Sequence, residues 1–206
     1  MRLQTHLSEL PLRLRTDDSW AYSALKQPLA LLSDHAYLEK KAASNALELL
    51  NRWPEPTCPE SWVVTLCAVA RDETSHLHSV IRLLERRGGR LERLHRNPYA
   101  NDLRGMVRKG SGRRELLDRL LVAALIEVRS CERFGVLARC CTDFELAQFY
   151  QSLWTSEFSH YKVFLQLAED IVPATEVRMR WEQMLEAEAR TIRMQPPGPR
   201  IHSGML

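Results

Sequence analysis

The stretch Glu73-Thr-Ser-His76 carries a glutamate and a histidine three positions apart, and Glu157-Phe-Ser-His160 repeats the same pattern. Residues i and i+3 lie on one face of a helix, so each pair would present a carboxylate and an imidazole together. One such pair arises often by chance. Two pairs, each near the middle of a segment with helical spacing of apolar residues, predict a helical bundle with metal ligands in its core.

Five long helices are predicted, because apolar residues recur every three or four positions and the prolines fall at segment edges. Four of them, at about 27–51, 59–87, 114–140 and 143–170, form two hairpins with short links. The connection of about 25 residues between the hairpins is long enough, at ~3.3 Å per residue, to return along a whole helix. The predicted fold is all-α, a single ferritin-like domain over 1–206. Its parts are a four-helix bundle at about 27–170, a C-terminal helix at about 175–193 and a flexible tail at 195–206.

Each hairpin also supplies a lone glutamate from its first helix, Glu39 and Glu127. The midpoints of the four predicted helices lie near residues 39, 73, 127 and 156, so four glutamates would meet at one level of the bundle. Carboxylates are costly to bury unpaired, and four together repel each other unless a cation lies between them. Glu132 competes with Glu127, but five residues on it is turned about 140° around the helix, away from the inner face.

Four carboxylates and two imidazoles are typical of a di-iron or di-manganese site, and the absence of thiolates argues against structural zinc. Asp72 is a candidate to accept a hydrogen bond from a ligand histidine, and His35, one turn before Glu39, to line the substrate cavity. A surface aspartate and an ordinary core histidine are the alternatives. The predicted metal ligands, of which the glutamates are also the catalytic residues, are Glu39, Glu73, His76, Glu127, Glu157 and His160.

The middle of the chain is strongly basic. From Arg82 to Arg114 there are eleven Lys/Arg and three Asp/Glu, a net charge of +8, whereas the whole chain carries +3. Three acids cannot pair eleven bases, which predicts an anionic partner such as a nucleic acid, with Tyr99 and His95 placed to stack on an unpaired base. The alternative is a solvated surface paired with acids elsewhere. The candidate contacts are Arg86, Arg87, Arg90, Arg93, Arg96, Arg108 and Lys109.

The first residues lack the continuous apolar stretch of a secretory signal, and apolar runs such as 120–126 are too short to cross a membrane. The five cysteines include no Cys-x-x-Cys pair. A reduced cytoplasmic protein without a membrane partner is therefore expected. The oligomeric state stays open.

Five segments, at 35–43, 70–76, 97–100, 116–134 and 156–161, resemble the MiaE family of bacterial tRNA hydroxylases, and the resemblance covers roughly 25–170. It implies a ferritin-like enzyme with two non-haem iron ions and O2 as co-substrate, with the family's ligands on the same six positions. The implied substrate is 2-methylthio-isopentenyl-adenosine beside the tRNA anticodon, hydroxylated on a terminal methyl of its isopentenyl group. Two electrons would come from an external reductase or ferredoxin, since the sequence has no flavin or nicotinamide fingerprint.

Two rival functions remain open. A ferritin-like iron oxidase or peroxide-scavenging protein would turn over without tRNA, and the basic segment argues against it. A non-enzymatic tRNA-binding helical protein would use the carboxylates structurally, which the predicted burial of all six ligands disfavours.

Overall fold

The computed structural model describes residues 7–54 and 56–205, and the elements in this part of the chain are helices without strands. The all-α prediction is confirmed, and the five predicted helices lie within two residues of their expected bounds. Two short helices, α2 and α5, were not expected. The elements are α2 (Asp18–Ala24), α3 (Pro28–Leu49), α4 (Glu60–Arg86), α5 (Pro98–Arg104), α6 (Arg113–Cys140), α7 (Phe144–Glu169) and α8 (Ala174–Met194).

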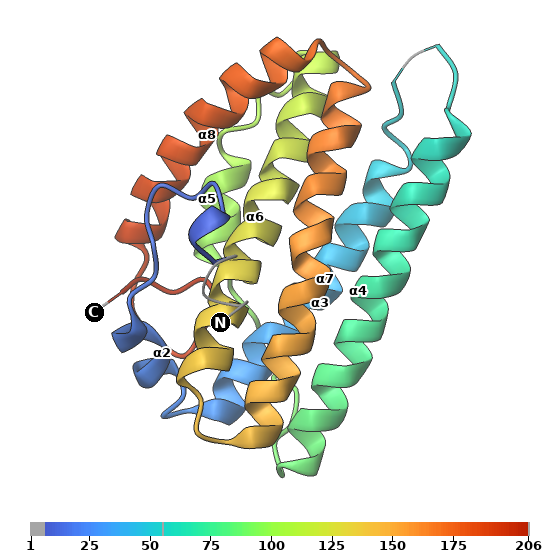
Figure 1. The fold of residues 1–206 in the computed structure, drawn as a ribbon. Helices are drawn as coiled ribbons and strands as arrows, with labels where there is room; N and C mark the ends of the chain where they lie inside the picture. Colours follow the sequence, from blue (N-terminus) through green and yellow to red (C-terminus); the bar gives the residue numbers. More distant parts are fainter. Residues whose placement is uncertain (1–6, 55, 206) are drawn as a thin grey trace.

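Four helices form two antiparallel hairpins, α3 with α4 and α6 with α7 (Figure 1). The crossover between them carries the chain from the lower end of α4 to the upper end of α6, along the whole bundle (Figure 1). Gly88 and Gly112, at its two ends, have φ values of 77° and 56°, which glycine adopts without strain. The two hairpins and the long crossover are the predicted ferritin-like topology.

Local hydrogen bonds set the start of several helices. The Asp143 carboxylate accepts from the backbone N–H of Leu146 at 3.0 Å and caps α7. Asn97 caps α5 in the same way through Ala100, with Pro98 in the first turn of that helix. The helix inside the crossover therefore has a recognisable Asn-Pro start, although it is only seven residues long.

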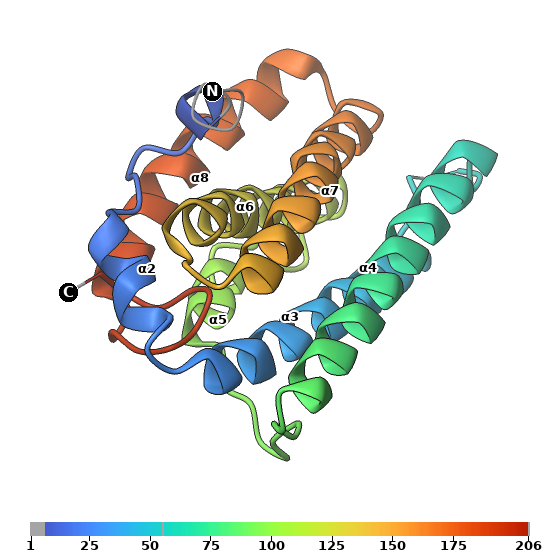
Figure 2. The same cartoon turned by 60° about the horizontal axis from the view of Figure 1, so that its bottom comes forward.

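Helix α6 lies at the centre of the molecule, with α7 on one side and α2, α5 and α8 covering its outer face (Figure 2). This cover buries charged residues that an isolated bundle would expose. Arg129 and Glu188 are 1% and 0% exposed, and Glu188 accepts two hydrogen bonds from the Arg129 guanidinium, both at 2.8 Å. The outer face of α6 is thus buried as well, and the charged residues on it are paired.

The C-terminal segment differs from the flexible tail expected from its proline and glycine content. Ile201 and Ser203 are 0% and 1% exposed. The Ile201 N–H donates to Asp34 at 2.9 Å, and the Trp20 indole donates to the Ser203 hydroxyl at 2.9 Å. Buried backbone groups with partners of this kind hold the described part of the segment against the bundle.

None of the described helices is long and apolar enough to cross a membrane.

Candidate metal centre

The six predicted ligands come together in the middle of the bundle. The four glutamates are each between 1% and 5% exposed, and His160 is 3% exposed. Mid-helix positions of near-parallel helices meet at one level, which is why residues so far apart in sequence converge. Glu39 lies on α3, Glu73 and His76 on α4, Glu127 on α6, and Glu157 and His160 on α7.

The ligand atoms form two overlapping groups. One contains Glu39, Glu73, His76 and Glu157, and the other replaces Glu39 and His76 by Glu127 and His160. Within each group the potential ligand atoms lie within 4.8 Å of one another. Glu73 and Glu157 belong to both groups, so their two carboxylate oxygens face two adjacent positions that could each hold an ion.

Both imidazoles turn Nδ1 toward the carboxylates. His76 Nδ1 lies 3.5 Å from Glu157 and 3.6 Å from Glu39. His160 Nδ1 lies 2.6 Å from Glu73 and 3.7 Å from Glu157. Nδ1 is therefore the nitrogen that each histidine offers to an ion.

Several buried ligand atoms have no hydrogen-bond partner among the described residues. They include both carboxylate oxygens of Glu73, one of Glu157, and the Nδ1 atoms of both histidines. The 2.6 Å approach of His160 to Glu73 lacks hydrogen-bond geometry, so it does not satisfy either atom. Buried polar atoms are normally satisfied, and a set that converges without bonding fits a bound cation. The donor set of carboxylates and imidazoles suits iron.

The electrostatics of the carboxylates reflect their crowding. Burial raises the pKa of Glu73 to about 8, with Glu157 adding to the rise. Burial and the charge of Glu157 also raise the pKa of Glu127 well above its ordinary value. Burial alone would raise the pKa of Glu157, but the proximity of Glu127 and of the two histidines outweighs it and lowers this pKa. Without a cation, the cluster must therefore hold protons to lie so close together.

The histidines respond in the opposite sense. Burial disfavours a charged ring, yet the adjacent carboxylates raise the pKa of His76 to about 12 and that of His160 to about 10. A metal ion at these positions would take over the role of those protons, because imidazole and carboxylate ligands bind metals in their deprotonated forms.

The two residues expected near the ligands, His35 and Asp72, both lie beside one of them. His35 Nε2 lies 2.5 Å from Glu39, and burial lowers the pKa of His35 to about 3, so a neutral ring donates to the carboxylate. Asp72 lies 3.7 Å from His160 Nε2, on the side of the ring opposite the cluster. His35 is fully buried and touches Glu39, so it supports a ligand instead of lining the pocket described below.

Glu132, the rival of Glu127, faces away from the cluster. Its carboxylate pairs with Arg129 and accepts from the backbone N–H of Thr16 at 2.8 Å. The preference for Glu127 on the inner face of α6 agrees with this placement.

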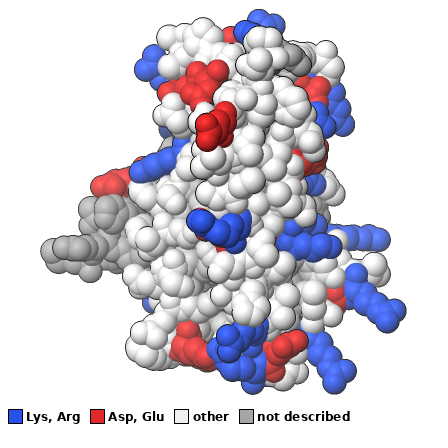
Figure 3. Space-filling model, turned by 90° about the vertical axis from the view of Figure 1, so that its right-hand side faces the viewer, with Lys and Arg blue, Asp and Glu red and all other residues white. Residues whose placement is uncertain are grey.

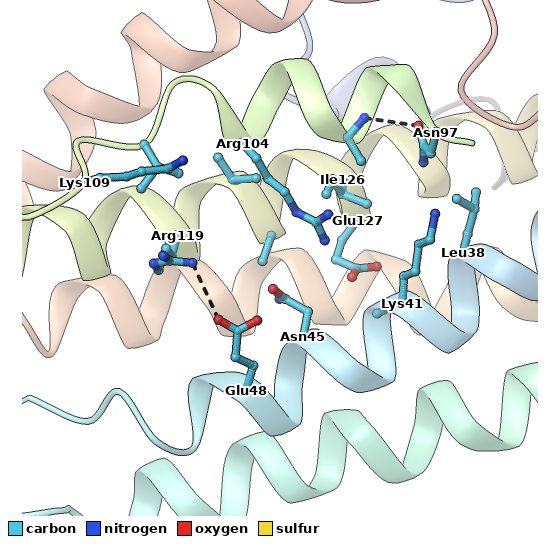
Figure 4. A pocket seen from close by; sticks show the side chains of 15 residues that line it. Leu38, Lys41, Asn45, Glu48, Asn97, Arg104, Lys109, Arg119, Ile126 and Glu127 are labelled. Atoms are coloured by element: carbon cyan, nitrogen blue, oxygen red, sulfur yellow. Dashed lines mark hydrogen bonds and ion pairs between the residues drawn. The ribbon is translucent and has the colours of Figure 1, made fainter. Parts of the chain in front are cut away.

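A pocket of about 240 Å³ leads to Glu127 between α3, α5 and α6 (Figure 4). Figure 4 shows Lys41, Arg104 and Glu127 directed into it from these three helices. No sequence pattern pointed to Lys41 or Arg104, because the crossover meets α3 only in the tertiary structure. The pocket's apolar lining residues are Leu38, Ala42, Ala100, Val107, Val122, Ala123 and Ile126.

The basic segment divides into paired and unpaired residues. Arg86 and Arg87 pair with Glu145, Arg87 also with Asp143, and Arg108 pairs with Asp118. Figure 3 shows acidic side chains next to basic ones at the lower end of one face, with further basic side chains along its right-hand edge. The predicted contacts that form no ion pair with a described residue are Arg90, Arg93, Arg96 and Lys109, and all four are exposed.

The expectation that Tyr99 and His95 stack on a base is wrong. Tyr99 has no exposed surface, and its hydroxyl donates to Glu188 at 3.0 Å. The His95 ring stacks on Tyr37, with ring centroids 4.8 Å apart. Both residues are occupied inside the protein because the crossover packs against α3 and α8.

Comparisons with known proteins agree with this geometry. The family model described as tRNA-(MS[2]IO[6]A)-hydroxylase (MiaE) matches residues 5–203. A tRNA 2-(methylsulfanyl)-N(6)-isopentenyladenosine(37) hydroxylase of Pseudomonas putida is 36% identical over 190 residues, 92% of this chain and 90% of that protein. A protein of the same name from Salmonella typhimurium is 30% identical over 176 residues, 84% of this chain and 61% of that one.

A solved structure is similar as well. Protein 43 with aldehyde deformylating oxygenase activity from Synechococcus matches with a TM-score of 0.86 and 34% identity, over 94% of this chain and 96% of that one.

Proposed function

The chain belongs to the MiaE family of tRNA hydroxylases, and we propose that it hydroxylates the isopentenyl group of 2-methylthio-isopentenyl-adenosine in tRNA anticodon loops. The observation that carries this proposal is a buried set of four carboxylates and two imidazoles at the end of a pocket with apolar walls. The names of the two curated relatives support the choice of substrate.

The centre would hold two iron ions. Glu39 and His76 would bind one ion and Glu127 and His160 the other, because each pair belongs to only one of the two overlapping groups. Glu73 and Glu157, which belong to both, would bridge the ions. Bound iron supplies the redox chemistry with O2 that no side chain here provides.

The pocket would receive the prenyl chain. Its apolar walls match the isopentenyl group, and Glu127 at its inner end marks the metal centre. These walls hold the substrate methyl beside the centre and exclude water from it. The base remains at the mouth of the pocket, which suits the single-stranded anticodon loop.

The residues around the ligands hold the centre in shape. His35 donates to Glu39 and fixes the orientation of that carboxylate on α3. Asp72 lies next to Nε2 of His160, where a hydrogen-bond acceptor favours presentation of Nδ1 to the ion.

The reaction balances as R–CH3 + O2 + 2 electrons + 2 protons giving R–CH2OH and water. The two electrons must be delivered from outside, and we assign this role to a reductase or ferredoxin. A cytoplasmic location belongs to the same proposal, since both tRNA and such a donor would be met there.

A second candidate is oxygenation of an aldehyde, the activity for which the similar Synechococcus protein is named. Iron oxidation or peroxide removal without an organic substrate is a third. The cations at the pocket, Lys41, Arg104 and Lys109, favour an anionic substrate over either.

One experiment separates these functions. Iron-loaded protein is supplied with a reductant, O2 and tRNA that carries the prenylated base, and nucleosides are then analysed by mass. A gain of one oxygen on the prenylated nucleoside is expected. Conversion of an aldehyde, or O2 consumption that tRNA does not alter, with no modified nucleoside in either case, would contradict the proposal.

A further inference from the structure

A chain of hydrogen bonds runs from the C-terminal segment to the pocket, outside the set of metal ligands. We propose that Lys41 binds a phosphate of the RNA at the pocket, and that His95 and Asp34 are positioning residues that hold its ammonium group in place. This inference rests on the proposed function. It adds a residue that binds the RNA and the two residues that orient it.

The series of hydrogen bonds from Lys41 to Asp34 is continuous. Lys41 Nζ lies 2.8 Å from His95 Nδ1, and His95 Nε2 lies 2.7 Å from an oxygen of Asp34. An ammonium group donates only, so Nδ1 must accept and Nε2–H must donate to the carboxylate. The bond to Lys41 therefore fixes the tautomer of His95 and uses one of the three protons of the ammonium group.

Asp34, at the end of this series of hydrogen bonds, is itself held in place. The second oxygen of Asp34 accepts from the Ile201 N–H at 2.9 Å. The His95 ring lies parallel to Tyr37, at an interplanar angle of 1°, and the Tyr37 hydroxyl donates to the backbone of Glu92. Asp34 is buried and the His95 side chain is only 8% exposed, so neither is free to change its partner.

The pocket has more cations than its acids neutralise. Arg119 is paired with Glu115 at 2.8 Å, but Lys41, Arg104 and Lys109 have no carboxylate partner among the described residues. Lys41 and Arg104 enter the same pocket from facing helices, and burial, and then the charge of Arg104, lower the pKa of Lys41. Like charges held together in this way favour an anion between them.

Phosphate is the anion that the proposed substrate carries next to the base. Lys41 belongs to the same pocket as Glu127, and Figure 4 shows both side chains entering it from facing helices. An RNA loop that inserts its prenyl chain toward Glu127 would bring its backbone past the outer cations. Two protons of the Lys41 ammonium group remain for that contact, in a direction set by His95.

The test compares Lys41→Ala with Lys40→Ala, its exposed neighbour on α3. Binding of iron-loaded protein to a prenylated anticodon stem-loop is measured at several salt concentrations. For Lys41→Ala we expect roughly tenfold weaker binding and a salt dependence shallower by about 0.7 in log–log slope, the value for one phosphate contact. Lys40→Ala should bind as the wild type does.

The role of His95 is tested by two substitutions. His95→Leu should weaken binding as Lys41→Ala does and add nothing to it in the double variant, since both remove the same contact. His95→Gln should keep most of the affinity, because an amide can both accept from Lys41 and donate to Asp34. Iron content and the melting temperature show whether each variant is folded.

Several results would overturn the inference. They are equal binding by Lys41→Ala and Lys40→Ala, weaker binding with an unchanged salt slope, and additive effects of Lys41→Ala and His95→Leu. Wild-type protein that binds the stem-loop but does not hydroxylate it would instead contradict the proposed function, so the two failures are distinct.

Discussion

His160 Nδ1 lies 2.6 Å from a carboxylate oxygen of Glu73, so a residue of the second hairpin meets one of the first inside the core. We predict that Glu73→Ala or Glu157→Ala abolishes hydroxylation and leaves the bundle folded. Removing either carboxylate leaves the iron undercoordinated but relieves repulsion in the iron-free protein. Iron content, helical circular dichroism and nucleoside analysis check this, with two iron atoms per chain expected in the wild type. Hydroxylation at the wild-type rate would refute the assignment.

The contact between His35 and Glu39 should support iron binding without touching the metal. We expect His35→Leu to weaken iron affinity by about 10- to 100-fold, the usual effect of losing a hydrogen bond to a ligand. Competition with a chelator measures this in the otherwise intact protein. His78→Leu, at an exposed position on α4, is the control and should leave iron affinity unchanged.

The exposed arginines of the crossover should contribute to RNA affinity. Charge reversal of Arg90 and Arg93 to glutamate is expected to weaken tRNA binding and flatten its salt dependence, with iron binding unchanged. A protein that makes fewer phosphate contacts releases fewer condensed counterions when it binds, and its affinity therefore depends less on salt. Reversal of Arg86 and Arg87 is the matched comparison. These two pair with carboxylates of α7 and its cap, so their reversal should lower the melting temperature.

An unchanged salt slope in the Arg90 and Arg93 variant, together with lower stability, would show that these arginines stabilise the fold and do not bind tRNA.

The buried pair of Arg129 and Glu188 should be a large contributor to stability. Glu188→Ala removes two acceptor oxygens of the buried Arg129 guanidinium, which keeps its pair with Glu132, and it removes the acceptor of the Tyr99 hydroxyl. One of two buried carboxylates beside the guanidinium is then lost, and we expect a loss of about 3–5 kcal/mol in the free energy of unfolding. Glu186→Ala, on the exposed side of the same helix, should change it by about 0.5 kcal/mol or less. Denaturant unfolding of both variants measures the difference. Equal small effects would show that the pair adds no net stability.

Asp143 should make stability depend on pH in the acid range. Hydrogen bonding from Arg87 lowers the pKa of Asp143 to about 2, from 3.8. A carboxyl group with a lowered folded-state pKa stabilises the protein above its unfolded pKa, and this is lost as the pH falls from about 4 toward 2. Asp143→Ala, which also removes the α7 cap, should cost about 1 kcal/mol at neutral pH. The difference from the wild type should shrink toward pH 2; a constant difference would contradict this origin.

Much of the bundle could be predicted because its signals are local. The bounds of α6 follow from helical periodicity between Gly112 and the end of its apolar face, and they need no knowledge of the rest of the chain. The convergence of the six proposed ligands could also be predicted, because i, i+3 spacing places Glu73 with His76 and mid-helix positions meet at one level. A feature that depends only on the spacing of residues along one helix can therefore be predicted from the sequence.

The tertiary structure alone decided what lies beyond that spacing. It placed His95 against Tyr37 and Asp34, and it packed Ile201 into the interior although its segment has a loop composition. It also separated Arg90 and Arg93, which form no ion pair with described residues, from Arg86 and Arg87, which do. These outcomes depend on which surfaces of distant segments meet, and the burial of a polar group is settled by the partner it finds there.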